Sequence, residues 1–421
     1  MDLEASEKAI RASMQETGGK ILEKLLNADQ GGYAGPHLSC SCGKRAGFVG
    51  YRDKQLVTVL SPVTVNRAYY HCGACGQGQI PKDEALDIAG TSFSPGVRRM
   101  MGRVGGKEAF EEGRRDLEEL AGVVVKTKAV ERVSEEIGRQ VEAAQQKERQ
   151  AALSGKLESL QAAPATLYIA IDGTGVPAVP RETQGRQGKD ETGRAKTREA
   201  KLGCVFTQTG VDEEGWPERD EQSTTYVGAI ERSEECGPRI YAEAVRRGLQ
   251  RAGRTVVLGD GAPWIWNIAN EHFPGAIQIV DLYHAREHLS ELGKTLYGST
   301  STTAKDWAAG RIEQLDAGNV EAVLTALKRL RPRNASVKKQ VHNTVHYFHT
   351  NAERMRYQKF RGMSLFVGSG VVEAGCKTVI GHRLKQSGMR WTVRGANAII
   401  ALRCNQLSRR WEEFWEARAA R

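Results

Sequence analysis

Acidic residues directly follow three apolar runs in the sequence, where carboxylates have the chemistry to bind hard divalent cations. Asp172 closes LYIAID, Asp260 closes TVVLGD and Asp281 closes AIQIVD. A carboxylate beside a buried run costs desolvation free energy unless it is paired or binds a metal. A fourth acid, Glu373, lies in GSGVVEAGCKTVIGHRLK, which has helical periodicity and Ser369 as a candidate N-cap. Gathered at one end of a sheet, three such acids would hold two divalent cations, whereas each Asp alone is more often a helix cap or turn residue.

Two pairs of cysteines suggest a second metal site. Cys40-x-Cys42 and Cys72-x-x-Cys75 are each followed by Gly, and the hairpin pattern QLVTVL-SP-VTVNRAYY lies between them. A hairpin that joins two such turns can gather four thiolates around a structural Zn²⁺. The first pair is one residue short of the regular spacing, so His37 is an alternative ligand to Cys40, and unliganded thiols are the other alternative. The remaining cysteines are isolated and are expected to be packed: Cys204, Cys236, Cys376 and Cys404.

Length and composition limit the class of protein. The chain has 421 residues, of which 40% are hydrophobic and 27% charged, which is typical of two to four globular domains. We find no apolar run of about 18 residues and no secretory signal pattern, which predicts no membrane partner, a cytoplasmic location and reduced cysteines.

Positive charge is concentrated near the C-terminus. Residues 321–421 contain 20 Lys and Arg against 6 Asp and Glu, a net charge of +14, so the other 320 residues carry −4. This asymmetry favours a polyanionic partner such as nucleic acid, because basic side chains displace the counterions of phosphates. The alternative is a solvated basic surface.

The elements that must position these residues change in type along the chain. We expect an N-terminal helix (1–30), a zinc-ribbon-like domain (31–90) and a helical domain (91–160). The two parts of an α/β core (161–298 and 361–421) then flank a helical insertion (299–360). The core has five strand-like runs, at TLYIAIDGTG, KLGCVFTQTG, STTYVGAI, TVVLGDGA and AIQIVDLYHA, and a Gly-rich loop over 181–199.

A helix-turn-helix is a further possibility in residues 116–138. One helix is predicted to end at Ala121-Gly122 and a second to begin near Lys126-Thr127. The apolar positions that fit its core are Leu117, Leu120, Val125, Val130 and Val133. An ordinary helical pair explains the same pattern.

Several long motifs resemble prokaryotic insertion-sequence DDE transposases, in the Kra-type group of the Mutator-like branch. They include the cysteine ribbon followed by PKDEAL, and then AIDGTGVP and TREAKLGCVFT. They also include GDGAPWIWNIANEHFPGAIQIVDLYHAREHL, YFHTNAERMRY and GSGVVEAGCKTVIGHRLKQSGMRWTVRGANAIIALR, so that the resemblance covers most of the chain. It implies an RNase H-like core, which is a five-stranded mixed sheet flanked by helices.

The resemblance also implies a catalytic triad and a reaction. The triad maps onto Asp172, Asp260 and Glu373, which would hold two Mg²⁺ (or Mn²⁺) ions for DNA cleavage at the element ends and transfer of the 3′-OH to target DNA. Asp281-x-x-His284 matches the Asp/Cys-x-x-His motif of the branch, so both residues are expected to be accessory. The rival assignment takes Asp281 as ligand in place of Asp260.

The basic segment after Glu373 is expected to contact DNA. The residues concerned are Lys377, His382, Arg383 and Lys385, with Arg390 and Trp391 as accessory residues. Trp391 would stack on an unpaired base or pack in the core. His342, His346 and His349 share a helical face, for which a packed or phosphate-facing role is favoured over zinc.

The expected partners are double-stranded DNA, as terminal inverted repeats and as target, and a second copy of the chain in a nucleoid-associated homodimer or higher oligomer. The ribbon and the helix-turn-helix would recognise the repeats. Two other functions remain open. One is a non-catalytic zinc-ribbon and helix-turn-helix regulator, and the other is a structure-specific RNase H-like nuclease.

Overall fold

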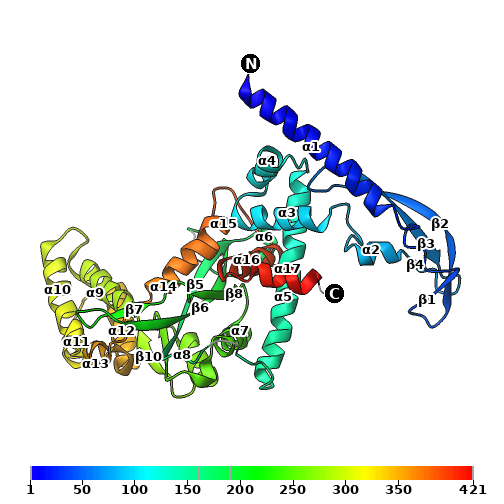
Figure 1. Cartoon of the computed structure of the whole chain (residues 1–421). Coiled ribbons are helices and arrows are strands. Elements are labelled where there is room, and N and C mark those ends of the chain that lie inside the picture. Colours follow the sequence, from blue (N-terminus) through cyan, green and yellow to red (C-terminus); the bar gives the residue numbers. More distant parts are fainter. Residues whose placement is uncertain (1, 160–161, 189–190, 420–421) are drawn as a thin grey trace. The chain divides into compact units, whose positions relative to one another are not determined.

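The computed structural model describes residues 2–159, 162–188 and 191–419 (Figure 1). The chain divides into two compact units, Met1–Ile137 and Gly138–Arg421. Helix α5 (Thr127–Leu153) passes from the first unit into the second. The domain boundary predicted at 160/161 and the last two residues of the predicted segment 361–421 lie outside the described residues.

The first unit begins with helix α1 (Leu3–Leu26), whose N-terminus is capped because the Asp2 carboxylate accepts from the Ala5 amide. A four-stranded antiparallel sheet of order β1-β2-β3-β4 follows. Its strands are β1 (His37–Ser39), β2 (Arg45–Leu56), β3 (Val63–His71) and β4 (Gly78–Gln79), and helix α2 (Pro81–Ala85) comes next. Arg67 of β3 donates to Asp83 of α2 at 2.8 Å in a buried ion pair.

Helices α3 (Pro95–Lys107), α4 (Phe110–Ala121) and the start of α5 complete the first unit. Gly122 ends α4 in the left-handed conformation, with φ of 69°, at the predicted turn. Gly113 and Leu117 are the buried positions of α4, and Gly113 packs against Val104 of α3. Leu120, expected in the core, is instead 71% exposed, because only the Gly113–Leu117 side of α4 is covered.

The second unit is built on a mixed sheet of order β10-β9-β5-β6-β7, with β8 also paired to β6. Strands β5, β9 and β10 are mutually parallel, and β6 runs antiparallel to β5, β7 and β8. The strands are β5 (Thr166–Pro177), β6 (Thr197–Val211), β7 (Pro217–Arg219), β8 (Thr225–Ala229), β9 (Arg254–Gly259) and β10 (Ile277–Val280). All five predicted apolar runs form strands, and β7 is an addition that extends the β6 hairpin.

Helices surround this sheet and insert between its last strand and the C-terminal helices (Figure 1). Those that follow individual strands are α6 (Pro180–Thr183), α7 (Ser233–Arg246), α8 (Pro263–His272) and α9 (Leu282–Tyr297). The inserted ones are α10 (Thr302–Asp316), α11 (Val320–Lys328), α12 (Ala335–Thr350) and α13 (Tyr357–Gly362). The last are α14 (Gly370–Gly375), a π-helical turn η3 (Cys376–Gly381), α15 (His382–Leu384), α16 (Val393–Leu407) and α17 (Trp411–Ala419). Within the described residues, no helix has the length and apolar character needed to span a membrane.

Candidate functional site

Three acids lie at the same level of adjacent parallel strands: Asp260 and Asp281 directly follow β9 and β10, whereas Asp172 lies within β5, which continues to Pro177 and does not end at Asp172 as the sequence suggested. The β5–β9 register pairs Ala170 with Leu258, so two residues later Asp172 lies level with Asp260. The β9–β10 register pairs Gly259 with Val280, so Asp281 follows in the same row. Neighbouring strands lie about 4.8 Å apart, and the carboxyl ends of parallel strands are the common position of ligand sites in open α/β sheets.

Asp172 is half-buried on β5, and its environment disfavours the charged form. The pKa of its carboxyl group is raised, chiefly by burial, and the negative charges of Asp260 and Glu373 add to this rise. The Gly173 amide, which donates to the carboxylate at 2.6 Å, and the Cys376 thiol act in the opposite direction. A divalent cation beside Asp172 would remove this penalty, because it neutralises the mutual repulsion of the acids.

Asp260 is held by its own turn and by a distant helix. One carboxylate oxygen accepts from the Ala262 amide at 2.8 Å, just before α8 begins. The Tyr347 hydroxyl, on α12 of the insertion, donates to the Asp260 carbonyl at 2.8 Å, and Asn351 donates to the Gly261 carbonyl at 3.4 Å. The insertion therefore fixes the position of this acid, a role that residue spacing in the sequence does not reveal.

Glu373 reaches the site from helix α14, which lies against β5 and β6. The close approach depends on Gly375, where an added Cβ would come within 2.9 Å of the Cys204 sulfur on β6. Glu373 is exposed, and the Ser369 hydroxyl lies 3.5 Å from its carboxylate. Ser369 occupies the N-cap position but makes no side-chain cap bond, so its expected capping role is replaced by this contact. A π-helical turn begins three residues after Glu373, at Cys376, and such turns are frequent at functional sites.

Cys376 was expected to be only a packed residue, but it also contacts the site. Burial, and then the negative charge of Asp172, raises the pKa of the Cys376 thiol. Cys376 therefore lies close to Asp172, where the segment after Glu373 packs against β5. The sequence signal for this position was that Cys376 follows Glu373 by three residues, which places both on the same side of a helix.

Asp281 is fully buried, and both of its carboxylate oxygens accept backbone hydrogen bonds. One accepts from the His284 amide at 2.6 Å, which caps α9, and the other accepts from the Ser369 amide. The Leu282 amide also donates to the Val367 carbonyl at 2.9 Å. Asp281 therefore joins the start of α9 to the segment that leads into the Glu373 helix, which suits a positioning role.

Two histidines of α9 extend this side of the site. His284 is half-exposed, and its Nδ1 atom lies 3.5 Å from a carboxylate oxygen of Glu287. The ring centroids of His284 and His288 are 4.9 Å apart. The His288 ring in turn packs against Tyr347, with the two ring centroids 4.1 Å apart. Burial, and then the proximity of His284, lowers the pKa of His288, while the charges of Glu287 and Asp260 oppose this. His288 and Tyr347 were not singled out from sequence.

The acids are close enough to interact but do not form a single-ion cage. Among the described residues, the only metal-ligating group whose atoms all lie within 4.8 Å of one another is the cysteine cluster. A two-ion site does not need such convergence, because one bridging carboxylate contacts both ions while the outer carboxylates each contact one.

That cysteine cluster consists of Cys40, Cys42, Cys72 and Cys75, and does not include His37. The sulfur atoms of Cys40 and Cys75 are 3.6 Å apart, and those of Cys42 and Cys72 are 3.7 Å apart. Four thiols at the two ends of the β2–β3 hairpin region match the donor set of a structural zinc site.

The protonation behaviour of the cluster also fits a cation. The Cys42 backbone amide is the main cause that lowers the pKa of Cys40 to about 6, and the amides of Cys75 and Ala74 lower that of Cys72. For Cys75 the Gln77 amide acts to lower the pKa, but the three neighbouring cysteines together raise it to about 12. Four thiolates cannot coexist here without a positive ion to offset their repulsion.

The basic residues after Glu373 are divided between surface and core. Lys377, His382, Lys385 and Arg390 are exposed, and Lys385 donates to Thr174, two residues beyond Asp172. Arg383 is fully buried, with its guanidinium 5.2 Å from the Trp391 ring centroid, so it does not reach a phosphate in this conformation and the expected contact is corrected.

Trp391 packs in the core, whereas the α12 histidines are exposed and so do not have the packed role that was one of their expectations. Trp391 is 9% exposed, donates from its ring nitrogen to the Leu384 carbonyl at 3.1 Å and pairs through its backbone with the end of β5. The core-packing interpretation therefore holds over base stacking. His342, His346 and His349 are exposed and belong to no metal-ligating cluster among the residues described.

Part of the chain is similar to a known protein family. Residues 246–414, which contain Asp260, Asp281 and Glu373, match an uncharacterised protein family, UPF0236. No curated protein matches the chain. Among solved structures, the Drosophila P element transposase strand transfer complex aligns with 10% identity, over 74% of this chain and 80% of that chain. Its TM-score of 0.23 is too low to carry an argument about fold or function.

Proposed function

We propose that the chain is a DDE-type transposase with an RNase H-like core, which cleaves transposon-end DNA and joins the 3′-OH to target DNA. The observation that carries the proposal is the placement of three acids from three separate elements. Asp172 and Asp260 lie level on adjacent parallel strands, and Glu373 lies on a helix that packs against β5 and β6. The strand order and directions of the mixed sheet support it. A bound pair of Mg²⁺ ions would supply Lewis-acid activation of the attacking oxygen and stabilisation of the leaving oxygen.

The residues of the chain have distinct tasks in this proposal. Asp172, Asp260 and Glu373 would hold the ions. Asp281 and Tyr347 position the elements that carry Asp260 and Glu373. Lys385, exposed beside Thr174, would contact a phosphate next to the acids. The cysteine cluster and the α4–α5 pair would recognise the element ends, with Zn²⁺ stabilising the ribbon.

One assay separates this function from its alternatives. The protein is incubated with Mg²⁺, labelled element-end DNA and a target plasmid. Joined product supports transposition, cleavage without joining supports a structure-specific nuclease, and a mobility shift without cleavage supports a regulator. The nuclease is the second candidate, because the same acids serve both reactions.

We also propose that two copies pair through helix α1, since joining two DNA ends requires at least two active sites. Leu3, Ile10, Met14, Ile21 and Leu25 are 56–69% exposed and recur at spacings of seven and four residues, which forms one stripe about 33 Å long. The opposite face is already occupied. There Gly19 packs against Ser61, and Glu23 accepts from the Thr64 amide at 2.7 Å.

Placing Glu at positions 10 and 21 together (Ile10→Glu, Ile21→Glu) should convert a wild-type dimer into a monomer at micromolar concentration, because two charges would be buried at the interface. Sedimentation velocity measures the change. Ala5→Glu with Ala9→Glu, at exposed positions off the stripe, adds the same charge and should leave the dimer intact. A monomeric wild type, or a double variant that still dimerises, would show that α1 is not the interface.

A further inference from the structure

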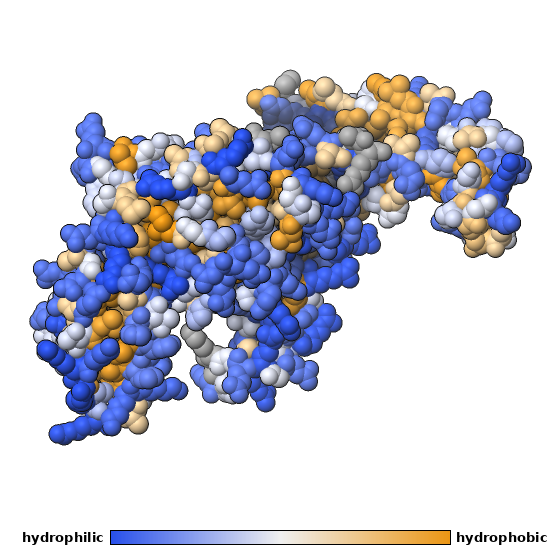
Figure 2. Space-filling view, turned by 90° about the horizontal axis from the view of Figure 1, so that it is seen from below, coloured by the Kyte–Doolittle hydropathy of each residue, from blue (hydrophilic) through white to orange (hydrophobic). Residues whose placement is uncertain are grey.

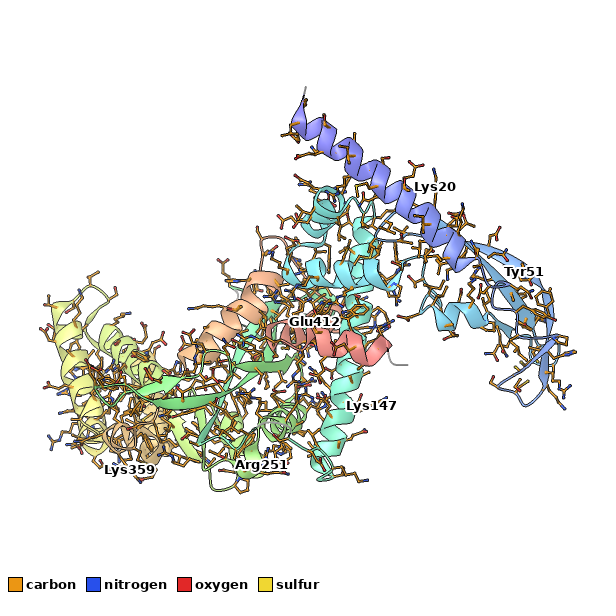
Figure 3. All side chains as sticks on the ribbon, in the orientation of Figure 1. Lys20, Tyr51, Lys147, Arg251, Lys359 and Glu412 are labelled. Atoms are coloured by element: carbon orange, nitrogen blue, oxygen red, sulfur yellow. The ribbon has the colours of Figure 1, made fainter. Side chains whose placement is uncertain are left out.

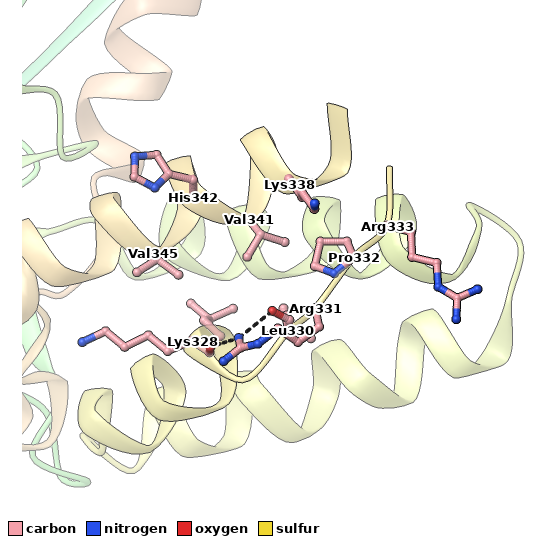
Figure 4. Close-up of a pocket in the computed structure, with 10 residues that line it drawn as sticks. Lys328, Leu330, Arg331, Pro332, Arg333, Lys338, Val341, His342 and Val345 are labelled. Atoms are coloured by element: carbon pink, nitrogen blue, oxygen red, sulfur yellow. Dashed lines mark hydrogen bonds between the residues drawn. The ribbon is translucent and has the colours of Figure 1, made fainter. Parts of the chain in front are cut away.

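Helices α11 and α12 border a groove of about 600 Å³ that the proposed active site does not use (Figure 4). Its apolar floor includes Leu327, Val341 and Val345, and its rim carries Lys328, Arg331, Arg333 and Lys338. At the end of the second unit where the inserted helices lie, Figure 2 shows apolar surface bordered by hydrophilic residues. The lining contains no carboxylate.

The charge around this groove is uncompensated. Residues 322–350 contain six Lys and Arg and no Asp or Glu, and all six cations are exposed. None of them has an ion-pair partner among the residues that the structure describes, whereas nearby Glu321 pairs with Arg356 at 2.6 Å. Arg331 is held at the rim because it donates to the carbonyls of Lys328 at 2.6 Å and Leu330 at 3.0 Å (Figure 4). An anion is therefore the complementary ligand.

The groove faces away from the acids. Lys338, Val341, His342 and Val345 lie on one face of α12, at spacings of three and four residues. Tyr347, which contacts Asp260, is about 200° further around the helix from Val345 and packs on His288. A ligand in the groove thus leaves the acidic site open.

We propose that this groove binds the sugar-phosphate backbone of duplex DNA, away from the reaction centre. The choice of DNA as the anion rests on the proposed function. The lining offers no Phe, Tyr or Trp on which an unpaired base could stack, and it offers several cations on flexible stems, which favours backbone contact without sequence readout. Such contacts increase affinity in a strongly salt-dependent way.

The test is the salt dependence of binding to a short duplex of random sequence. The variant combines Lys328→Gln, Arg331→Gln, Arg333→Gln and Lys338→Gln, all at exposed positions, so that folding should be retained and is checked by thermal unfolding. We expect affinity to fall at least about tenfold at physiological salt, and the slope of log Kd against log salt to fall by about 0.9 for each lost phosphate contact. Full-length protein is used throughout.

The matched control carries four Lys→Gln changes at exposed positions outside the groove, namely Lys147, Lys156, Lys305 and Lys359 (Lys147 and Lys359 are labelled in Figure 3). It should retain most of the wild-type affinity and slope. Equal losses in both variants would mean that overall charge, not the groove, binds DNA and would overturn the inference. Inorganic triphosphate is also tested as a competitor of the bound duplex. If it competes as well as unlabelled duplex DNA at equal phosphate concentration, the groove is a site for small anions, and the inference is overturned.

The cleavage assay separates failure of this inference from failure of the proposed function. A wild type that does not cleave DNA, but whose binding depends on the groove cations, would refute the enzymatic proposal alone. Normal cleavage with unchanged binding by the groove variant would refute the groove alone.

Discussion

Replacing Asp172 with Asn should lower the rate of Mg²⁺-dependent DNA cleavage by at least about a thousandfold, because loss of a shared metal ligand removes about 4 kcal/mol or more of transition-state stabilisation. Asp260→Asn and Glu373→Gln should have similar effects. DNA binding should persist or tighten slightly, since each change removes a negative charge near the phosphates. Single-turnover cleavage and a mobility-shift assay measure the two quantities.

Asp281→Asn is the discriminating comparison for this prediction. Because both Asp281 oxygens accept backbone hydrogen bonds, the amide would face a donor with its NH₂ group and destabilise the fold by about 1–3 kcal/mol. Below its melting temperature this variant should keep the wild-type dependence of rate on Mg²⁺ concentration. Full activity in Asp260→Asn together with loss of metal dependence in Asp281→Asn would reverse the assignment of the two acids.

Cys72→Ser should abolish stoichiometric zinc binding and unfold the ribbon. Structural zinc contributes an apparent free energy of about 10–16 kcal/mol in zinc-finger peptides, more than a four-stranded sheet of this size gains from its own core. Elemental analysis should find one zinc per wild-type chain and much less in the variant, and trypsin should cleave within residues 31–90. The control is Cys236→Ala, a fully buried cysteine of the second unit, which should retain its zinc.

Zinc retention should also depend on pH in a defined direction. The thiolate form of Cys40, whose pKa is lowered to about 6, is available to the metal above that pH and is lost as the pH falls through it. Protons therefore compete with zinc below about pH 6, and a chelator should strip the metal faster at pH 5 than at pH 7.5. Zinc content that is unaffected both by pH and by Cys72→Ser would exclude this cluster as the binding site.

Much of this architecture follows from local sequence patterns. Short β-branched runs with nearby Gly predicted all five main strands, because their length and β-branched residues favour a buried strand over a helix. The spacing of the cysteines predicted the cluster, since a hairpin returns its two ends to the same place. Gly122 marked the end of α4, because the left-handed residue there suits glycine.

Other features depend on contacts between distant residues, which spacing does not encode. Tyr347 reaches Asp260 across 87 positions of sequence. Asp281 was predicted to be accessory from its motif, but spacing did not predict its bond to the Ser369 amide, 88 positions away. The predicted DNA contact of Arg383 was wrong, although the sequence contained the signal that it is buried. Arg383 lies seven residues after buried Cys376 and three after buried Ile380, which places it on the buried face of the helix.

The central claim is that Asp172, Asp260 and Glu373 share a two-ion site. Anomalous diffraction from crystals of the protein grown with Mn²⁺ tests it most directly. We expect two Mn²⁺ peaks about 3.5–4 Å apart, with Asp172 contacting both ions and Asp260 and Glu373 each contacting one. Peaks located away from these carboxylates, or no peak beside them at a Mn²⁺ concentration that supports DNA cleavage, would contradict the claim.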